Sequence, residues 1–314
     1  MADLILHHYP ASPYAEKVRA ILGFKKLAWK SVIIPMVMPK PDVLALTGGY
    51  RRTPILQIGA DIYCDSGLIA RVLERAAPSP TLFPYGDDIV THALGHFGEA
   101  VLFNTAAVLA FAGSGVRAHM PDASPQFLDT FRNDRAAMRK GGSVRRGPPA
   151  ECRAAMLHFL PMLEAQFRDG RPFLTGASPC NADFCVYHPL WAVARTPGVR
   201  AIFNPFPRVD AYVDRIMAFG HGKPAEISSA KALEVARTAT PAPVGRGLAT
   251  ELEDLGIALG HSVDVLPVDY GFDPVRGELL DCSADEIVVR RTDSRAGTVH
   301  VHFPRVGYEV RKAV

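Results

Sequence analysis

The chain has 314 residues, 48% of them hydrophobic, which is enough for two or three domains with a sizeable core. Its 35 basic and 32 acidic side chains nearly balance, which argues against a nucleic-acid or anionic-membrane partner for the whole chain. The five cysteines form no CxxC pair and the N-terminus has no signal-peptide pattern, so we expect a reduced, cytoplasmic protein. The longest uncharged run, Ala100 to Val116, is short for a membrane span of about 20 residues and predicts a bundle helix instead.

The first 84 residues alternate between strand and helix patterns. Leu4–Leu6 predicts a buried strand, and apolar residues at helical spacing follow from Ser12, with Pro13 at the first helical position. Trp29–Ile34 predicts a second strand, which a right-handed crossover would place parallel to the first. The order predicts an α/β domain.

The same unit continues with two more strands and a helix. Thr53–Ile58 predicts a strand opened by Pro54, and a tight turn at Gly59 leads into a short partner strand. The pair Asp65-Ser66 then begins another helix. The order is strand, helix, strand, followed by two strands and a helix.

The rest of the chain divides into a helical region and a strand region. Apolar stripes with helical spacing recur over Thr91–Val116, Pro125–Lys140, Pro149–Arg168, Ala182–Ala194 and Arg208–Phe219. Residues 238–247 are rich in Pro, Ala and Gly and predict a linker. Beyond it the apolar period changes to two, so we expect three domains: α/β over 1–84, all-helical over 88–238, and a small β-barrel-like module over 245–314.

Taken singly, the motifs of the first unit have ordinary structural explanations. Ser12 is a typical helix N-cap, Thr53-Pro54 an ordinary strand start, and Asp65-Ser66 an ordinary capped helix start. Their order and spacing together carry more information. With the strings YPASPYAEKVR, RRTPIL, YCDSGLIARVLE and NADFCVYHPLW, the chain resembles the glutathione S-transferases over roughly residues 3 to 237.

This resemblance implies a thioredoxin-like domain followed by an all-helical domain. It also implies that Ser12 stands where related redox proteins carry a nucleophilic cysteine, with Ala15 at the second cysteine position, so dithiol chemistry is excluded there. In such serine-type transferases the hydroxyl donates to the thiol of bound glutathione and favours its thiolate. Tyr9 and Tyr14 remain alternative hydroxyls for this role.

The resemblance also implies the residues that hold glutathione. Pro54 matches the family's cis-proline, which leaves the backbone of Thr53 free to pair with the cysteinyl part of the ligand. Asp65 and Ser66 match the pair that binds the γ-glutamyl end. Arg52 falls near the glycyl carboxylate, where a solvated surface charge is an equally good interpretation and Arg51 competes for the role.

We therefore expect a glutathione transferase that attacks a small hydrophobic electrophile in detoxification, as a homodimer with glutathione as co-substrate and no metal. The alternative is a non-enzymatic glutathione-binding or scaffold protein that keeps the transferase fold. His300 and His302 lie two residues apart on a predicted strand, without an apparent third metal ligand, and are interpreted as part of a solvated face. Acidic residues outnumber basic ones beyond residue 260, which excludes a nucleic-acid role for the last module. A chain ending at Thr238 is expected to bind glutathione still.

Overall fold

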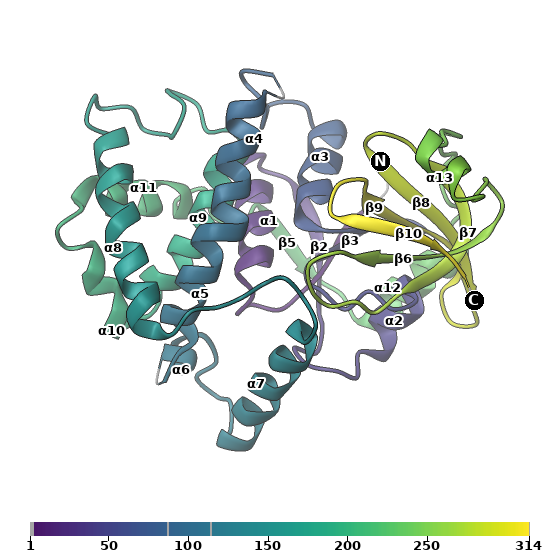
Figure 1. Cartoon of the computed structure of the whole chain (residues 1–314), viewed down its shortest axis with the longest axis horizontal. Helices are drawn as coiled ribbons and strands as arrows, with labels where there is room; N and C mark the ends of the chain where they lie inside the picture. The colour runs from purple at the N-terminus through teal and green to yellow at the C-terminus, as the bar shows by residue number, and fades with distance from the viewer. Residues whose placement is uncertain (1–2, 87, 114, 314) are drawn as a thin grey trace.

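The computed structural model describes residues 3–86, 88–113 and 115–313. Figure 1 shows three regions in a row: a helical bundle on one side, a curled set of strands on the other, and a mixed α/β unit between them. The α/β unit therefore contacts both the helical bundle and the C-terminal strands.

The α/β unit has the thioredoxin-like order predicted from the sequence. Its elements are β1 (Leu4–His8), α1 (Pro13–Phe24), β2 (Ala28–Ile33), α2 (Pro41–Thr47), β3 (Ile55–Ile58), β4 (Asp61–Cys64) and α3 (Ser66–Ala76). Strand β1 runs parallel to β2 and antiparallel to β3, which forms a hairpin with β4. The side chain of Ser12 caps α1 and Pro13 occupies its first turn, where no backbone donor is needed.

The helical region follows as a bundle. Its elements are α4 (Ile89–His96), η1 (Phe97–Leu102), α5 (Phe103–Phe111), α6 (Gly115–His119), α7 (Pro125–Arg139), α8 (Pro149–Gln166), α9 (Asn181–Ala194), α10 (Pro197–Arg200), η2 (Ala201–Phe203) and α11 (Pro207–Met217). The first three form one helix, Ile89–Phe111, that is long and apolar enough to cross a membrane by length and composition alone. It packs against α8 and α9, as expected for a helix of a bundle.

Residues after α11 return to the α/β unit, although they fall in the range expected for the helical domain. Strand β5 (Lys223–Glu226) pairs in parallel with β2 and extends the sheet at that edge. Helix α12 (Ser229–Thr238) packs against α2 and β2, and the side chain of Gln57 donates to the carbonyl of Ala232 at 2.9 Å. Hydrogen bonding therefore crosses the predicted boundary.

The C-terminal region consists of a short helix and five strands: α13 (Thr250–Asp254), β6 (Ser262–Pro267), β7 (Val275–Cys282), β8 (Glu286–Asp293), β9 (Gly297–Pro304) and β10 (Tyr308–Lys312). These strands confirm the expected β region, but they do not form a separate sheet. Strand β9 pairs in parallel with β4, so one ten-stranded sheet has the order β10-β6-β7-β8-β9-β4-β3-β1-β2-β5.

The two halves of this sheet also share one hydrophobic core. Ile5 and Ile62 of the α/β unit are buried in the same cluster as Val301, Phe303 and Tyr308 of the C-terminal strands. Such continuity is not expected of a module joined only by a linker. The division into three domains stays a prediction, while packing and hydrogen bonds join the α/β unit to residues of both other predicted domains.

Candidate functional site

A cavity of about 1360 Å³ lies where the three regions meet. All eight candidate residues named from the sequence line it: Tyr9, Ser12, Tyr14, Arg52, Thr53, Pro54, Asp65 and Ser66. The helical region adds apolar and basic side chains from α5, α7 and the segment after α7. The C-terminal region adds Asp269 and Tyr270 from the loop between β6 and β7 and Tyr308 from β10, which sequence reasoning did not assign to any site.

Ser12 lies at the N-terminus of α1 and lines this cavity. Its side chain is nearly buried, and Oγ accepts a hydrogen bond from the backbone N–H of Ala15 at 3.2 Å. A hydroxyl that accepts at its oxygen keeps its own proton to donate. Within the described part of the chain Oγ donates to no partner, so the capping role and a donor role toward a ligand are compatible.

The two alternative hydroxyls are in different situations. Tyr14 donates to the backbone carbonyl of Glu99 at 2.9 Å, so its proton is already engaged. The hydroxyl of Tyr9 accepts from Nη2 of Arg135 at 3.1 Å and keeps its proton. The geometry therefore removes Tyr14 as a free donor and leaves Tyr9 as the rival of Ser12.

Thr53 and Pro54 bring free backbone groups to the cavity. The peptide bond between them is cis, as the family resemblance implied. The N–H and C=O of Thr53 make no hydrogen bond with any other residue that the structure describes. Such unpaired groups beside a strand can pair with an extended ligand as an additional strand would.

Asp65 and Ser66 belong to a buried cluster of charges at the start of α3. The Oγ of Ser66 donates to Glu99 Oε1 at 3.2 Å, and the fully buried ammonium of Lys17 pairs with the same oxygen at 2.6 Å. Asp65 accepts from the backbone N–H of Gly67 at 2.8 Å, so it caps α3. Neither Lys17 nor Glu99 had been named from the sequence. Glu99 comes from the helical region and lines this side of the cavity.

The C-terminal region covers Asp65 directly. The hydroxyl of Tyr308 donates to Asp65 Oδ2 at 3.2 Å and lies 3.3 Å from the hydroxyl of Tyr50. Burial, reinforced by the nearby charge of Glu99, raises the pKa of Asp65 above its ordinary value. Lys17 balances one of the two carboxylates, so a second cation beside Asp65 would balance the other, and the geometry suits an ammonium group.

Arg52 is not the solvated charge that the sequence allowed. Its guanidinium pairs with Asp269 and the carbonyl of Tyr270, and it stacks on the Tyr270 ring at 3.9 Å. Its Nε is buried and has no hydrogen-bond partner among the described residues, so one donor stays open. The competitor Arg51 is held by Asp134 of α7.

Two arginines of the helical region were missed by the sequence analysis. Arg139 and Arg146 line the cavity, and in the described part of the chain neither guanidinium pairs with a carboxylate. Burial and the neighbouring Arg135 lower the pKa of Arg139, and burial and Arg139 lower that of Arg146. Unpaired cations that repel each other in a cavity favour an anionic ligand. In sequence they look like ordinary surface charges, so no local signal distinguishes them.

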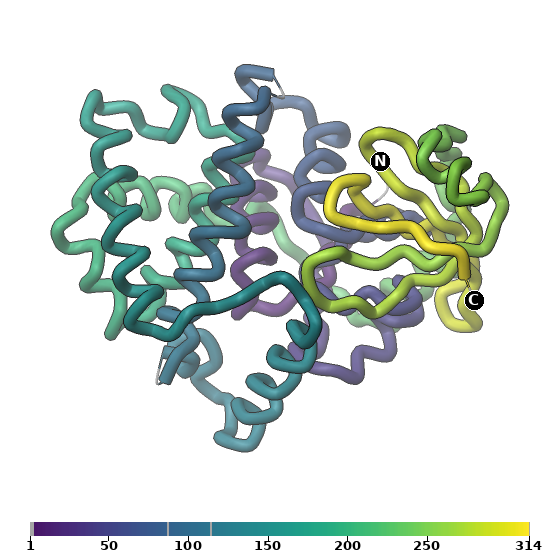
Figure 2. The backbone as a smooth tube through the Cα atoms, viewed as in Figure 1, coloured from purple at the N-terminus to yellow at the C-terminus, as the bar shows by residue number. Residues whose placement is uncertain are grey.

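The segment after α7 contacts the loop between β6 and β7. Figure 2 shows this segment, residues 140–148, crossing the front of the molecule. The N–H of Ser143 donates to Asp269 O at 3.0 Å, and the N–H of Gly271 donates to Met138 O at 2.8 Å. A Cβ at Gly142 would lie 2.2 Å from Asp269 O, so only glycine permits this approach. The helical and C-terminal regions thus meet over the candidate site.

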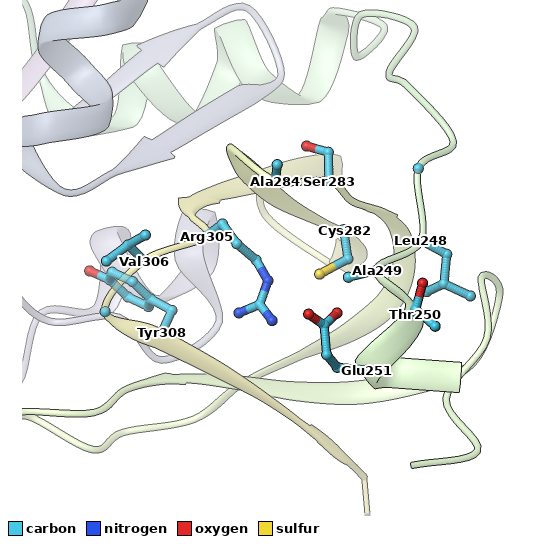
Figure 3. Close-up of a pocket in the computed structure, with 12 residues that line it drawn as sticks. Leu248, Ala249, Thr250, Glu251, Cys282, Ser283, Ala284, Arg305, Val306 and Tyr308 are labelled. Carbon is cyan, nitrogen blue, oxygen red and sulfur yellow. The ribbon is translucent and has the colours of Figure 1, made fainter. Parts of the chain in front are cut away.

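A second cavity of about 690 Å³ lies wholly within the C-terminal region (Figure 3). Glu251 and Arg305 point toward each other, and Cys282 lies on the same side of the cavity. Burial raises the pKa of Cys282, which opposes a reactive thiolate. Tyr308 and Val306 line this cavity and the central one alike, so the turn before β10 separates the two.

The fold and the site define a class of protein that the comparisons identify. The family model of the glutathione S-transferase N-terminal domain matches residues 6–81. A GST-like protein from Pseudomonas syringae is 41% identical, with a TM-score of 0.81 and complete coverage of both chains. This chain belongs to the glutathione S-transferase family, whose members bind glutathione, and the relative shares the C-terminal region because the match covers the whole length.

Other solved structures show the fold alone. Glutathione transferase GSTFuA3 from Phanerochaete chrysosporium is 18% identical over 69% of this chain and 97% of its own, with a TM-score of 0.53. A glutathione S-transferase from Rhodospirillum rubrum F11 is 18% identical over 68% and 88%, with a TM-score of 0.51. No curated protein matches this chain.

Proposed function

We propose that this protein is a glutathione transferase in which the hydroxyl of Ser12 donates to the sulfur of bound glutathione. The observation that carries the proposal is that Ser12 lines the cavity with its oxygen used as a helix cap and its proton free. Tyr9 is the alternative donor from the same loop.

The chemical reason is the preference of electrophiles for a thiolate. A free thiol ionises near pH ~8.5, and one hydrogen bond to a charged group contributes about 1.5–3 kcal/mol. At about 1.36 kcal/mol per pKa unit, that bond lowers the thiol pKa by roughly one to two units. The N-terminus of α1 adds a smaller effect of the same sign. A large fraction of the bound thiol would then be ionised at neutral pH.

The remaining contacts fix the peptide. The backbone of Thr53, just before β3, pairs with the cysteinyl residue. The backbone N–H of Ser66 at the start of α3 receives the γ-glutamyl carboxylate, because the Ser66 hydroxyl already donates to Glu99. The γ-glutamyl ammonium lies between Asp65 and Glu99. The open Nε of Arg52 is the donor for the glycyl carboxylate.

The Asp65 assignment gives a prediction with opposite effects on binding and stability. Asn at this position keeps the helix cap and tolerates the φ of 81°, but it carries no charge. Asp65→Asn is expected to weaken glutathione binding about 10–100-fold, the value of one charge-assisted contact. Calorimetry measures this loss, with the exposed Asp122→Asn as control.

The free energy of unfolding should change in the other direction. Because burial raises the pKa of Asp65, the native state binds more protons than the unfolded state, so Asp65 destabilises the fold as the pH rises through that window. The variant should therefore melt at the same or a higher temperature at neutral pH. Wild-type affinity in Asp65→Asn would remove this residue from the glutathione site.

The second substrate is proposed to carry an apolar body and a negative charge. Phe103, Val108 and Phe111 form an apolar side of the cavity, which suits a small hydrophobic electrophile. Arg139 and Arg146 face the same space without carboxylate partners in the described structure. An electrophile with a carboxylate would neutralise them.

A panel of matched electrophiles, with and without a carboxylate, tests this proposal and the activity together. The variant Arg139→Ala/Arg146→Ala should raise KM about 10-fold or more for the carboxylate-bearing members and leave the neutral ones unchanged, and the exposed Arg168→Ala should change neither. Equal effects on both sets would contradict the anionic preference. Glutathione binding without turnover of any electrophile would support the alternative, a non-enzymatic binding or scaffold protein. A cytoplasmic homodimer with a role in detoxification belongs to the same proposal.

A further inference from the structure

His300 and His302 do not form the solvated face expected from the sequence. Both side chains turn toward the junction of β9 with β4, where they are 11% and 5% exposed, and Asp61 beside them is 6% exposed. The strand register explains the grouping, since Asp61 lies opposite His300 in the β4–β9 ladder. The imidazole of His302 stacks on the ring of Tyr63. This packing holds the imidazole against β4.

Three possible ligand atoms converge at this junction. Asp61 Oδ1 lies 3.0 Å from His302 Nε2 and 3.7 Å from His300 Nδ1, and all three atoms lie within 4.8 Å of one another. Zinc bonds of about 2.0–2.2 Å with tetrahedral angles put neighbouring ligand atoms about 3.3 Å apart. The cluster would therefore close on an ion with shifts smaller than an ångström.

Two further observations point to a ligand. The Nδ1 atom of His300 is buried and has no hydrogen-bond partner among the described residues, which is costly unless something binds it. On the far side of His302, Nδ1 lies 2.5 Å from Glu286 Oε1. A carboxylate behind a ligating imidazole is the usual outer partner that orients a metal-bound histidine. Asp61 is held as well, since Oδ2 accepts from the N–H of Ala242 at 2.9 Å.

We propose that Asp61, His300 and His302 bind a divalent transition-metal ion of the zinc class, with Glu286 orienting His302. Two imidazole nitrogens and one carboxylate suit zinc, and a water molecule would complete the tetrahedron. The ion replaces the proton between His302 Nε2 and Asp61 Oδ1, which leaves to solvent, so no oxidation or reduction is involved.

The site is structural rather than part of the transferase chemistry. None of its four residues lines the central cavity. Asp61 belongs to the α/β unit and the other three to the C-terminal strands, so a bound ion would fasten the two halves of the sheet at the point where they join. The ion should therefore raise the melting temperature and leave glutathione binding unchanged.

Metal analysis of the full chain after equilibration with Zn²⁺ and dialysis tests the site without relying on a variant. We expect one bound ion per chain, visible absorption of tetrahedral Co²⁺ when Co²⁺ replaces Zn²⁺, and a melting temperature that Zn²⁺ raises and a chelator lowers. No bound ion in the wild-type chain would overturn the proposal and leave the cluster as an ion pair between an imidazolium and two carboxylates.

Variants then locate the ion. His300→Ala leaves the pairing of His302 intact and should abolish the Co²⁺ spectrum and the melting shift, while the exposed His158→Ala should change neither. Glu286→Gln keeps a hydrogen-bond acceptor with less charge and should weaken zinc binding about 10–100-fold. A Co²⁺ spectrum that persists in His300→Ala would place the ion elsewhere and overturn the assignment.

Discussion

A chain that ends at Thr238 is expected to lose glutathione binding, which reverses the expectation from the sequence, and to associate or unfold. Truncation removes β9 from the edge of β4 and uncovers apolar residues that share a core with the C-terminal strands. It also leaves the guanidinium of Arg52 without Asp269 and without the ring of Tyr270. Arg52 then becomes solvated and loses the contacts that fix its guanidinium at the cavity.

A point variant separates loss of the fold from loss of the site. Tyr308→Phe keeps the buried ring and removes only the hydroxyl that lies between Asp65 and Tyr50. A hydrogen bond to a charged group contributes about 1.5–3 kcal/mol. Glutathione affinity should therefore fall about 10-fold or more while the fold persists. The half-exposed Tyr85→Phe is the matched control.

Three measurements on the truncated chain and on Tyr308→Phe decide the question: glutathione affinity by calorimetry, melting temperature, and oligomeric mass. A truncated chain that is monomeric, melts normally and binds glutathione as the full chain does would show that the C-terminal strands are an independent module. Our placement of Tyr308 and Tyr270 in the site would then be wrong.

Ser12→Ala is expected to reduce kcat/KM about 10–100-fold, with little change in glutathione affinity. The hydroxyl is proposed to act on the sulfur, whereas the proposed contacts to the peptide come mainly from Thr53, Asp65 and Ser66, which line the same cavity. Losing one hydrogen bond to a thiolate removes about 1.5–3 kcal/mol of its stabilisation, which appears in the rate. Steady-state kinetics with a single electrophile measures this change.

The variant also removes a helix cap, which costs about 1 kcal/mol of stability by itself. Ser228→Ala provides the control, because Ser228 caps α12 in the same way through the N–H of Lys231 and lies outside the central cavity. The two variants should lose similar stability, and only Ser12→Ala should lose activity. An equal loss of activity in both would assign the effect to stability. Tyr9→Phe in parallel measures the alternative hydroxyl.

The thioredoxin-like and helical regions could be predicted because their signals are local. Ser12-Pro13 and Asp65-Ser66 begin helices where the chain itself supplies the cap, and the structure has both caps in place. Pro54 marks the start of a strand in the same way. Each of these motifs needs only its immediate neighbours to act, so the sequence pattern is sufficient.

The interactions that close the site join distant parts of the chain and leave no such pattern. Tyr308 reaches Asp65 across 243 positions, and Arg52 meets Asp269 across 217. The register of β9 against β4 places His300 opposite Asp61 and brings the imidazole of His302 to the same carboxylate, although the sequence of the strand shows only two histidines. Long-range strand pairing depends on the complete core, so the role of the C-terminal region emerges only from the structure.

The most direct test of the central claim is an ultraviolet titration of the thiol of bound glutathione in the wild-type protein and in Ser12→Ala. The midpoint in the wild type is expected to lie roughly one to two pH units below that of free glutathione, and the midpoint in the variant is expected to return most of the way to the free value. An identical, lowered midpoint in both proteins would contradict the role of Ser12 as the donor to the sulfur.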